Sequence, residues 1–429
     1  MNVYKQFRAI LFFLLLYNSG GHAQDIMINE YLASNVITYP EMYDFDDYSD
    51  WIELYNPGTA SYSLNGFFLT DDLADPLKWK IPDDTTIESE GYLIIWADDY
   101  NEGPGQVYVR PYWPWDEFTT QHYHTNFKIS SSGEDLILSD QDENVLDSIF
   151  TGEMETDMSF GRYFESDSWV LFAEPTPGFS NSSSSYAGAL SPIEFSMASG
   201  FYNQGQISVE LSNPDESATI YFTTDGTAPT MDDLPYGYSI PLTSTTVIRA
   251  RAFLEGWLAS DVESKTYILE EDEPDSLPVV FLSTDPNNFF DNDTGIYAMG
   301  SNASWDFPYF GANFWEDWEC PIHFEILETD GSGYAANAGV KIFGGWSRGF
   351  PQKSLSIFSR SYYGPSTFDY TLFPDSGIDS YEAFVLRNSG NDWESTMLRD
   401  GFITSLTNDL NIDHQQYRPA VLYLNGEFW

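Results

Sequence analysis

Short apolar runs separated by turn-forming residues are the feature that most restricts the fold of this chain. In the first half the runs have strand length and end in Gly, Asn, Asp or Ser, as in IMINEYLASN and DWIELYNPG. Phe, Tyr and Trp make up 17% of the residues, and aromatic side chains favour pleated sheets. Runs of this length and spacing are typical of antiparallel β-sandwiches. We therefore predict a mainly β protein.

The first 23 residues have the three parts of a secretory signal peptide. Lys5 and Arg8 form a basic start, residues 9–17 are apolar, and Gly21-His22-Ala23 offers small residues before the cleavage point. The apolar run is too short to cross a bilayer as a helix, and no later run is long enough. We expect a secreted or cell-surface protein with no transmembrane span. An uncleaved anchor is the alternative reading.

Acidic residues far outnumber basic ones. Without Lys5 and Arg8 the 17 basic residues fall to 15 against 67 acidic ones, so the mature net charge is −52. Such a chain repels nucleic acid and anionic lipid, which excludes both as expected partners. Cys320 is the only cysteine, so no intrachain disulfide can form, and we expect it to be a small buried hydrophobe.

Two polar segments divide the mature chain into three parts. Residues 183–192 are serine-rich and predict a flexible linker, and residues 272–276 form an acidic, proline-containing one. The parts between them are 24–182, 193–271 and 277–429. We predict two tandem immunoglobulin-like β-sandwiches, followed by a third part of different character.

The first part, 24–182, resembles the lamin-tail domain. The likeness rests on NE at 29–30, WIELYN at 51–56, LNG at 64–66 and the closing TPG at 176–178, in that order. The resemblance implies an immunoglobulin-like sandwich. In DLILSD, Leu136 and Leu138 alternate with Ile137 and Ser139, which predicts a half-buried strand.

The second part, 193–271, resembles the small C-terminal sandwich of chitobiases and hexosaminidases. The likeness rests on YFTTDGTAP at 221–229 and on the strand TVIRARAF at 246–253. In that strand Ile248, Ala250 and Ala252 share one face, which predicts one buried side, and Thr224-Asp225-Gly226 predicts a tight turn. In that family the module is accessory, so no activity follows from it.

The third part resembles the CotH family of secreted, atypical kinases. The stretches that carry the likeness are GGWSR at 344–348, QKS at 352–354, LRNSGND at 386–392, LRD at 398–400 and LNGEFW at 424–429. The resemblance implies the incomplete N-terminal half of an α+β kinase-like domain. The catalytic aspartate and metal-binding acid of the family lie further on, so we expect a truncated, inactive fragment with no catalytic residue to assign.

Residues 339–358 of this third part hold three of the scarce basic residues, Lys341, Arg348 and Lys353. Lys353 falls on the apolar face of the predicted strand KSLSIFS, where an ammonium is costly unless an anion meets it. Kinases use a strand lysine to hold nucleotide phosphates, which makes ATP and Mg²⁺ the implied cofactors. Ser347 and Arg348, beside two glycines, are candidates to line the same phosphates. A hairpin turn and a strand-end lysine are the plain alternatives.

A helix is predicted over residues 392–411. Asp392 is its expected N-cap, Asn411 suits its C-terminus, and Leu398, Phe402, Ile403, Leu406 and Leu410 form an apolar stripe. Glu394 or Asp400 would pair with Lys353, and the pattern does not choose between them. The closing VLYLNGEFW reads as a strand cut in mid-element.

Other candidate sites lie in the first part. Tyr112, Trp113 and Trp115 form either a sugar-stacking platform or an aromatic cap. Asp44, Asp46 and Glu53 suggest calcium but lack a defined calcium loop. His122 and His124 suggest a shared metal, without a third ligand at recognisable spacing.

Two function classes follow. In the first, the complete protein transfers the ATP γ-phosphate to protein hydroxyls. In the second, the chain is a surface adhesion or carbohydrate-binding protein with a kinase-like scaffold. The partner is accordingly a protein substrate or a cell-surface carbohydrate.

Overall fold

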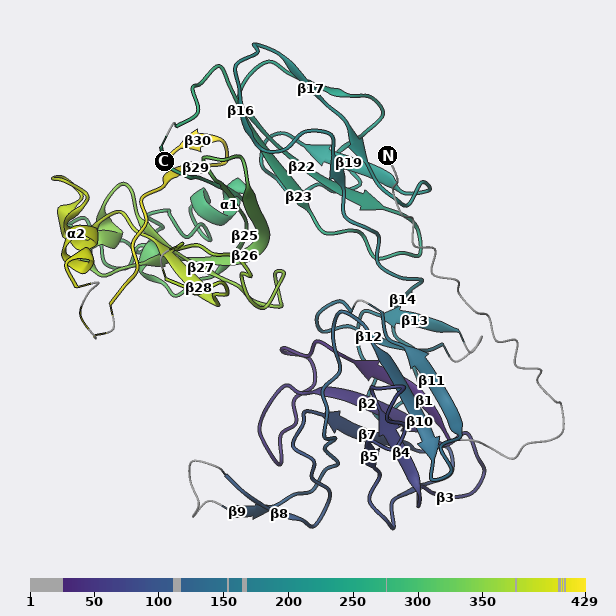
Figure 1. The fold of residues 1–429 in the computed structure, drawn as a ribbon. Helices are drawn as coiled ribbons and strands as arrows, with labels where there is room; N and C mark the ends of the chain where they lie inside the picture. The colour runs from purple at the N-terminus through teal and green to yellow at the C-terminus, as the bar shows by residue number, and fades with distance from the viewer. Residues whose placement is uncertain are drawn as a thin grey trace, which may run out of the picture. The chain divides into compact units, whose positions relative to one another are not determined.

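The computed structural model describes residues 26–429 except 111–116, 153, 164–167, 275, 375, 408, 409, 411 and 413. These residues form two compact units (Figure 1). The first is built from the described residues up to Met154, with 159–163 and 174–182, and the second from 155–158, 168–173 and 183–429. The predicted signal peptide and the aromatic trio 112, 113 and 115 lie outside the described residues.

The first unit contains two antiparallel sheets and two short strand pairs. One sheet has the order β12-β1-β2-β7 within this unit, and its strands are β1 (Met27–Leu32), β2 (Asp50–Tyr55), β7 (Tyr92–Ala97) and β12 (Ser159–Arg162). The other has the order β11-β10-β4-β5, with β4 (Phe67–Thr70), β5 (Trp79–Lys80), β10 (Asp135–Asp140) and β11 (Val145–Phe150). The short pairs are β3 (Tyr62–Ser63) with β6 (Thr86–Ile87), and β8 (Val107–Val109) with β9 (Glu117–Thr119). This arrangement confirms the first predicted sandwich.

The strand DLILSD is more deeply buried than its alternation predicted. All four central side chains of β10 are buried, including Ile137 and Ser139, so the prediction of a half-buried strand was wrong. The Ser139 hydroxyl donates a hydrogen bond to the carbonyl of Pro76, so the chain before β5 covers the face that was expected to meet water. Local alternation cannot report a covering segment that is distant in sequence.

The second sandwich is confirmed in the second unit. Its main sheet has the order β16-β23-β22-β19-β20, and its strands are β16 (Gly200–Tyr202), β19 (Thr219–Thr223), β20 (Leu234–Pro235), β22 (Thr246–Phe253) and β23 (Glu263–Leu269). Smaller pairs of this sandwich are β17 (Ile207–Val209) with β21 (Ile240–Leu242) and β15 (Glu194–Phe195) with β18 (Leu211–Ser212). The second unit also includes β13 (Trp169–Phe172) paired with β14 (Ser185–Tyr186), which are not strands of this sandwich. In β22, Ile248, Ala250 and Ala252 are fully buried, as the pattern predicted.

The segment 183–192, expected as a flexible linker, is hydrogen-bonded to this sandwich. The amides of Ala187 and Leu190 donate to the carbonyls of Gly256 and Leu258, and the Leu190 side chain joins the sandwich core. Backbone hydrogen bonds therefore hold this serine-rich segment against the sandwich.

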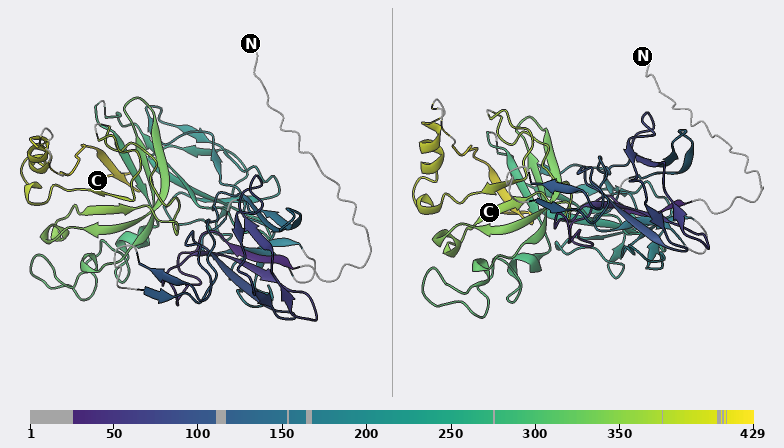
Figure 2. Two further views of the ribbon diagram at one scale, coloured as in Figure 1. Left: turned by 60° about the horizontal axis from the view of Figure 1, so that its bottom comes forward. Right: turned by 90° about the horizontal axis from the view of Figure 1, so that it is seen from below.

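The third part is built on a seven-stranded sheet with the order β28-β27-β26-β25-β24-β29-β30. Its strands are β24 (Val279–Ser283), β25 (Cys320–Leu327), β26 (Gly333–Phe343), β27 (Ser354–Phe358), β28 (Ala383–Leu386), β29 (Val421–Leu424) and β30 (Glu427–Phe428). The helical elements are α1 (Pro286–Phe290), α2 (Arg399–Ser405) and the 3₁₀ turns η1 (Asn313–Trp315), η2 (Trp346–Gly349) and η3 (Gly390–Asp392). Figures 1 and 2 show α2, in yellow, at the side of the sheet away from the second sandwich. Cys320 is buried, and burial raises the pKa of its thiol to about 12.

The closing stretch VLYLNGEFW forms a hairpin, which corrects the expectation of a single cut strand. β29 and β30 pair antiparallel across Asn425 and Gly426. Both of these residues have positive φ, 48° and 82°, as a type I′ turn requires, and Asn-Gly is the pair that most favours this turn.

The second sandwich and the seven-stranded sheet share contacts inside the second unit. Ile268 of β23 packs with Phe281 and Tyr423 in one apolar cluster. Beside it, the Lys265 ammonium lies 3.1 Å from a carboxylate oxygen of Glu325, and Ser199 donates to the other oxygen of that carboxylate. Among the described residues, no helix has the length and apolar character that a membrane crossing requires.

Candidate functional site

Lys353 lies immediately before β27, and its ammonium is buried. Its Nζ donates to the carbonyls of Arg348 and Phe350, at 2.7 and 2.8 Å, and lies over the rings of Phe314 and Tyr297. Its backbone amide donates to the Tyr297 hydroxyl. Burial lowers the pKa of Lys353 to about 8, because water no longer stabilises the charge. In the described part of the chain, no carboxylate pairs with this ammonium.

The turn at 344–349 is held by the second cation of the motif. Arg348 donates from Nε to the carbonyl of Gly344 at 2.7 Å, and from Nη1 to that of Phe314 at 3.0 Å. Gly344 has φ of +110°, and a Cβ there would meet the Ser347 hydroxyl oxygen at 2.6 Å. The glycine is thus needed for the close approach of this hydroxyl. Lys353, Ser347 and Arg348 gather at one turn, where both cations bind backbone carbonyls.

A cavity of about 450 Å³ lies beside Lys353. Its apolar wall comes from the sheet and includes Val280, Phe324 and Phe384, and its polar lining includes Lys353 and Arg387. Nη2 of Arg387 lies 2.7 Å from a carboxylate oxygen of Asp400, which also lines the cavity. An apolar wall together with the cationic Arg387 in the lining suits a ligand with an aromatic ring and an anionic group.

Asn388 joins two of the motifs that carry the family likeness. Its Oδ1 accepts from the Ser354 hydroxyl at 2.9 Å and from the Gly390 amide at 2.9 Å, and its Nδ2 donates to the Gln352 carbonyl at 2.6 Å. The stretches at 352–354 and 386–392 therefore form one hydrogen-bonded corner beside the cavity. Sequence reasoning gave Asn388 no role, and its position in a matched motif was the signal that could have found it.

The two candidate partners of Lys353 lie in different surroundings. Glu394 is exposed, and it is not part of the cavity lining. Asp400 lines the cavity but pairs with Arg387 rather than with Lys353. The cavity lining includes Lys353 and Asp400 but not Glu394. Because Asp400 pairs with Arg387, an ion pair between Lys353 and either acid stays a prediction.

The predicted helix over 392–411 was too long, because α2 covers only Arg399–Ser405. Asp392 does satisfy helix amides as expected, since its Oδ2 accepts from the amides of Leu398 and Arg399. Between them the chain makes a turn in which Met397 has φ of +56°. The carboxylate therefore caps α2 across a six-residue loop instead of at the adjacent position. Asn411 lies outside the described residues.

In the first unit, the lamin-tail motifs form a buried hydrogen-bond network. Glu53 accepts from Asn29 Nδ2 at 2.7 Å and from the Gly178 amide at 2.5 Å. Glu30 accepts from the Ser159 hydroxyl and from the Thr176 amide and hydroxyl. Burial raises the pKa of Glu53 to about 8, with a smaller contribution from the charge of Glu30. These residues tie β1, β2 and the closing turn together.

The calcium candidates Asp44, Asp46 and Glu53 are directed to different partners. Glu53 belongs to the network above, Asp46 is exposed, and Asp44 is buried against the amides of Gln121 and His122. His122 bonds to Glu41, and His124 bridges Asp44 and Asp98. Among the described residues, the group with metal-ligating geometry is Glu41, Asp44 and His122.

The folds define a chain with two sandwiches ahead of an α+β part that carries the cavity. Comparison with protein families gives the same order. Residues 19–153 match the lamin tail domain, residues 197–264 match the chitobiase/beta-hexosaminidase C-terminal domain, and residues 340–429 match the CotH kinase protein family. No curated protein matches the chain. The three resemblances expected from the motifs are therefore confirmed.

Proposed function

We propose that this protein, in its complete form, is a secreted or cell-surface kinase that transfers the γ-phosphate of ATP to protein hydroxyls. The observation that carries the proposal is the position of Lys353, a cavity-lining residue with a buried ammonium, in the segment matched to CotH kinases. An ammonium with two carbonyl partners has a third hydrogen to donate, and a phosphate would offset the cost of its burial.

The proposed nucleotide lies with its base against the apolar wall and its phosphates toward Lys353 and Arg387. Mg²⁺ bound with the nucleotide would neutralise charge that develops on the transferred phosphoryl group. Arg348 and Ser347 hold the shape of the turn from which Lys353 is positioned. Asp400 is the more suitable partner for Lys353 than Glu394, because it already lines the cavity.

Phosphate transfer by the complete gene product from radiolabelled ATP tests the proposal. Lys353→Ala is compared with Lys341→Ala, a lysine on the neighbouring strand β26 that pairs with Asp317 and Glu319 outside the cavity. Transfer is expected to fall at least tenfold in the first variant and to persist in the second. Equal transfer by Lys353→Ala and the unaltered protein would exclude the assigned role.

Adhesion is the second candidate function, and exposed aromatic side chains favour it. Trp305 and Tyr238 of the second unit are 98% and 90% exposed, and flat exposed rings are suited to stacking on sugars. Binding of the unlabelled chain to immobilised glycans, lost in Trp305→Ala and Tyr238→Ala, would support this function. If the chain binds glycans without nucleotide and the complete protein transfers no phosphate, adhesion is the better supported of the two functions.

A further inference from the structure

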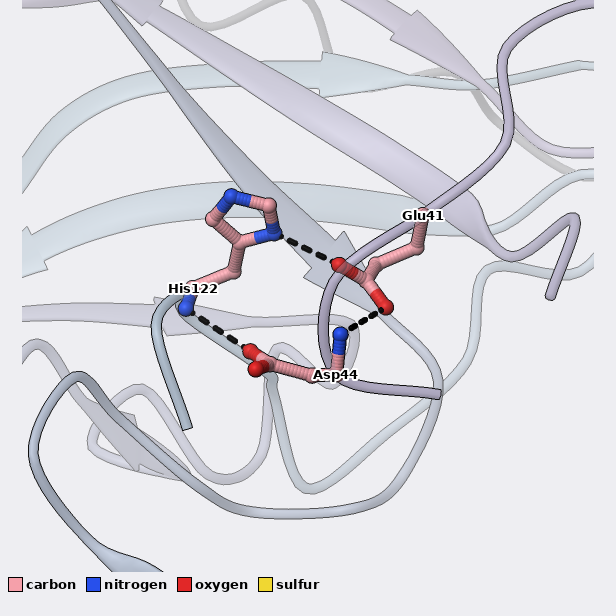
Figure 3. Close-up of side chains that lie close together, drawn as sticks. All are labelled: Glu41, Asp44 and His122. Atoms are coloured by element: carbon pink, nitrogen blue, oxygen red, sulfur yellow. Dashed lines mark hydrogen bonds and ion pairs between the residues drawn. The ribbon is translucent and has the colours of Figure 1, made fainter. Parts of the chain in front are cut away.

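Two loops and one strand end of the first unit bring five ionisable side chains together. Glu41 and Asp44 come from the loop before β2, His122 and His124 follow β9, and Asp98 follows β7. Glu41, Asp44, His124 and Asp98 are buried, whereas the His122 side chain keeps 34% of its exposure. One ligand atom from each of Glu41, Asp44 and His122 lies within 4.8 Å of the others. Figure 3 shows the His122 ring and the Glu41 carboxylate turned toward one another.

We propose that Glu41, Asp44 and His122 form a binding site for a zinc ion. Imidazole nitrogens and carboxylate oxygens are both ligands that Zn²⁺ takes in fourfold coordination, whereas Ca²⁺ takes six or more oxygens. Zinc bonds of about 2.0–2.1 Å in tetrahedral geometry place ligand atoms roughly 3.3 Å apart. His122 Nδ1 and Glu41 Oε1 are 2.7 Å apart, so a small outward shift of the exposed imidazole makes room for the ion.

The hydrogen bonds identify which lone pairs the ion would use. Glu41 Oε2 accepts from the amides of Asp44 and Phe45, and Oε1 accepts from Tyr43 and from His122 Nδ1. Only the last of these bonds comes from a side chain that can turn. When zinc binds, the ion takes the place of the proton that lies between Nδ1 and Oε1. The neutral ring then carries its proton on Nε2.

Asp44 supplies the third ligand. Its Oδ2 accepts from Gln121, His122 and His124, whereas Oδ1, among the described residues, accepts from the Gln121 amide alone and keeps a lone pair. A fourth ligand, water, would enter from the exposed side of His122.

The surroundings have the features of an outer shell around a metal. His124 donates to Asp44 and is itself oriented by Asp98 at 2.7 Å, which gives a carboxylate–histidine–carboxylate chain. Tyr43 packs edge-on to the His122 ring at 5.3 Å between ring centres. In the described part of the chain, the ion-pair partners of Glu41 and Asp44 are histidines rather than Lys or Arg. A divalent cation would add positive charge beside two buried carboxylates whose ion-pair partners, among the described residues, are histidines.

Titration of zinc chloride into the full chain, previously treated with EDTA, against a chromophoric chelator tests the site. We expect one Zn²⁺ per chain, with affinity reduced at least tenfold in His122→Gln and in Asp44→Asn. His414→Gln, which removes a histidine from the second unit, is expected to bind like the unaltered chain. Absence of binding, or equal binding by His122→Gln, would overturn the proposal and leave a hydrogen-bond network that only holds the loops.

X-ray absorption of the zinc-loaded unaltered chain provides a readout that does not depend on the folding of a variant. One imidazole nitrogen with oxygen ligands at about 2.0 Å is expected. A first shell of oxygen alone, or of several imidazoles, would contradict the assignment. Calcium chloride added in excess is expected not to displace zinc from the chain. Calcium binding that persists in His122→Gln would also overturn the zinc assignment.

Discussion

The side-chain nitrogen of Lys353 lies 3.9 Å from the centre of the Phe314 ring. With the carbonyls of Arg348 and Phe350, this aromatic face replaces the water that an exposed ammonium would have. The lysine is therefore tied to the turn that the family motif specifies, and the same contacts hold both in place beside the cavity. The first three predictions test this relationship.

Lys353→Met should separate the structural role of the ammonium from its role in binding. The methionine keeps the apolar stem against Phe314 but removes both donors to the turn carbonyls. We expect the free energy of unfolding of the second unit to fall by about 1–3 kcal/mol and nucleotide affinity to fall at least tenfold. Urea denaturation and titration with a fluorescent ATP analogue measure the two effects. Lys341→Met, which removes a partly exposed ion pair, should cost under about 1 kcal/mol and leave affinity unchanged.

Nucleotide affinity should decrease in alkaline solution. Because burial lowers the pKa of Lys353 to about 8, the ammonium loses its charge as the pH rises through 8. Affinity measured from pH 7, where phosphates are ionised, to pH 9.5 should therefore fall, and Lys353→Arg should show a flat profile. The stability effect has the opposite sign: the folded state holds this proton less tightly than the unfolded state, so stability rises between pH 8 and about 10. Identical profiles for both proteins would disprove the assignment of the pH effect to Lys353.

Asp400→Asn and Glu394→Gln should differ in their effect on nucleotide binding. Asp400 lines the cavity and orients Arg387, so its loss should weaken binding several-fold. Glu394 is exposed outside the lining, so its variant should bind normally. Each variant removes one carboxylate charge and keeps the size of the side chain. The Glu394 variant therefore controls for the loss of charge in the Asp400 variant. A larger loss in Glu394→Gln would reverse the choice of partner.

Glu53 should make the stability of the first unit depend on pH. Its pKa is raised to about 8, so the folded state binds the proton more tightly than the unfolded state. The resulting stabilisation is complete below about pH 4 and is lost as the pH rises through 8. Hydrogen exchange of β1 and β2, corrected for intrinsic rates, should thus show decreasing protection between pH 5 and 8.

Two substitutions at Glu53 check this behaviour. Glu53→Gln should flatten the dependence of protection on pH, because the titrating group is gone. Glu53→Ala should cost about 1–3 kcal/mol, since Asn29 and the Gly178 amide lose a buried acceptor. A slope that persists in Glu53→Gln would point to another group, of which Glu30 is the nearest in the network.

The parts of the fold that the sequence predicted depend on local pattern. The arginines at 249 and 251 alternate with buried residues because a strand has period two. The motif likenesses identified the three domain families and their order. These features need no knowledge of distant segments.

The incorrect or missing predictions involve contacts between distant residues. Ser139 is covered by a segment 63 positions earlier, and His122 meets Glu41 across 81 positions. Spacing alone could not show that His122 lies beside Glu41 and Asp44, because these acids belong to another loop. The Lys353 partners were missed for a different reason: they are backbone carbonyls, which no residue type reveals.

Cys320 offers a practical advantage for observing the 344–349 turn. Its thiol is buried and its pKa is raised to about 12, so it should resist alkylation at neutral pH, and the sequence has no second thiol. A cysteine introduced at Trp346, whose side chain is 64% exposed, would consequently be the one reactive position. A spin label or fluorophore there would report on the turn in solution, and Cys320 would not have to be replaced first.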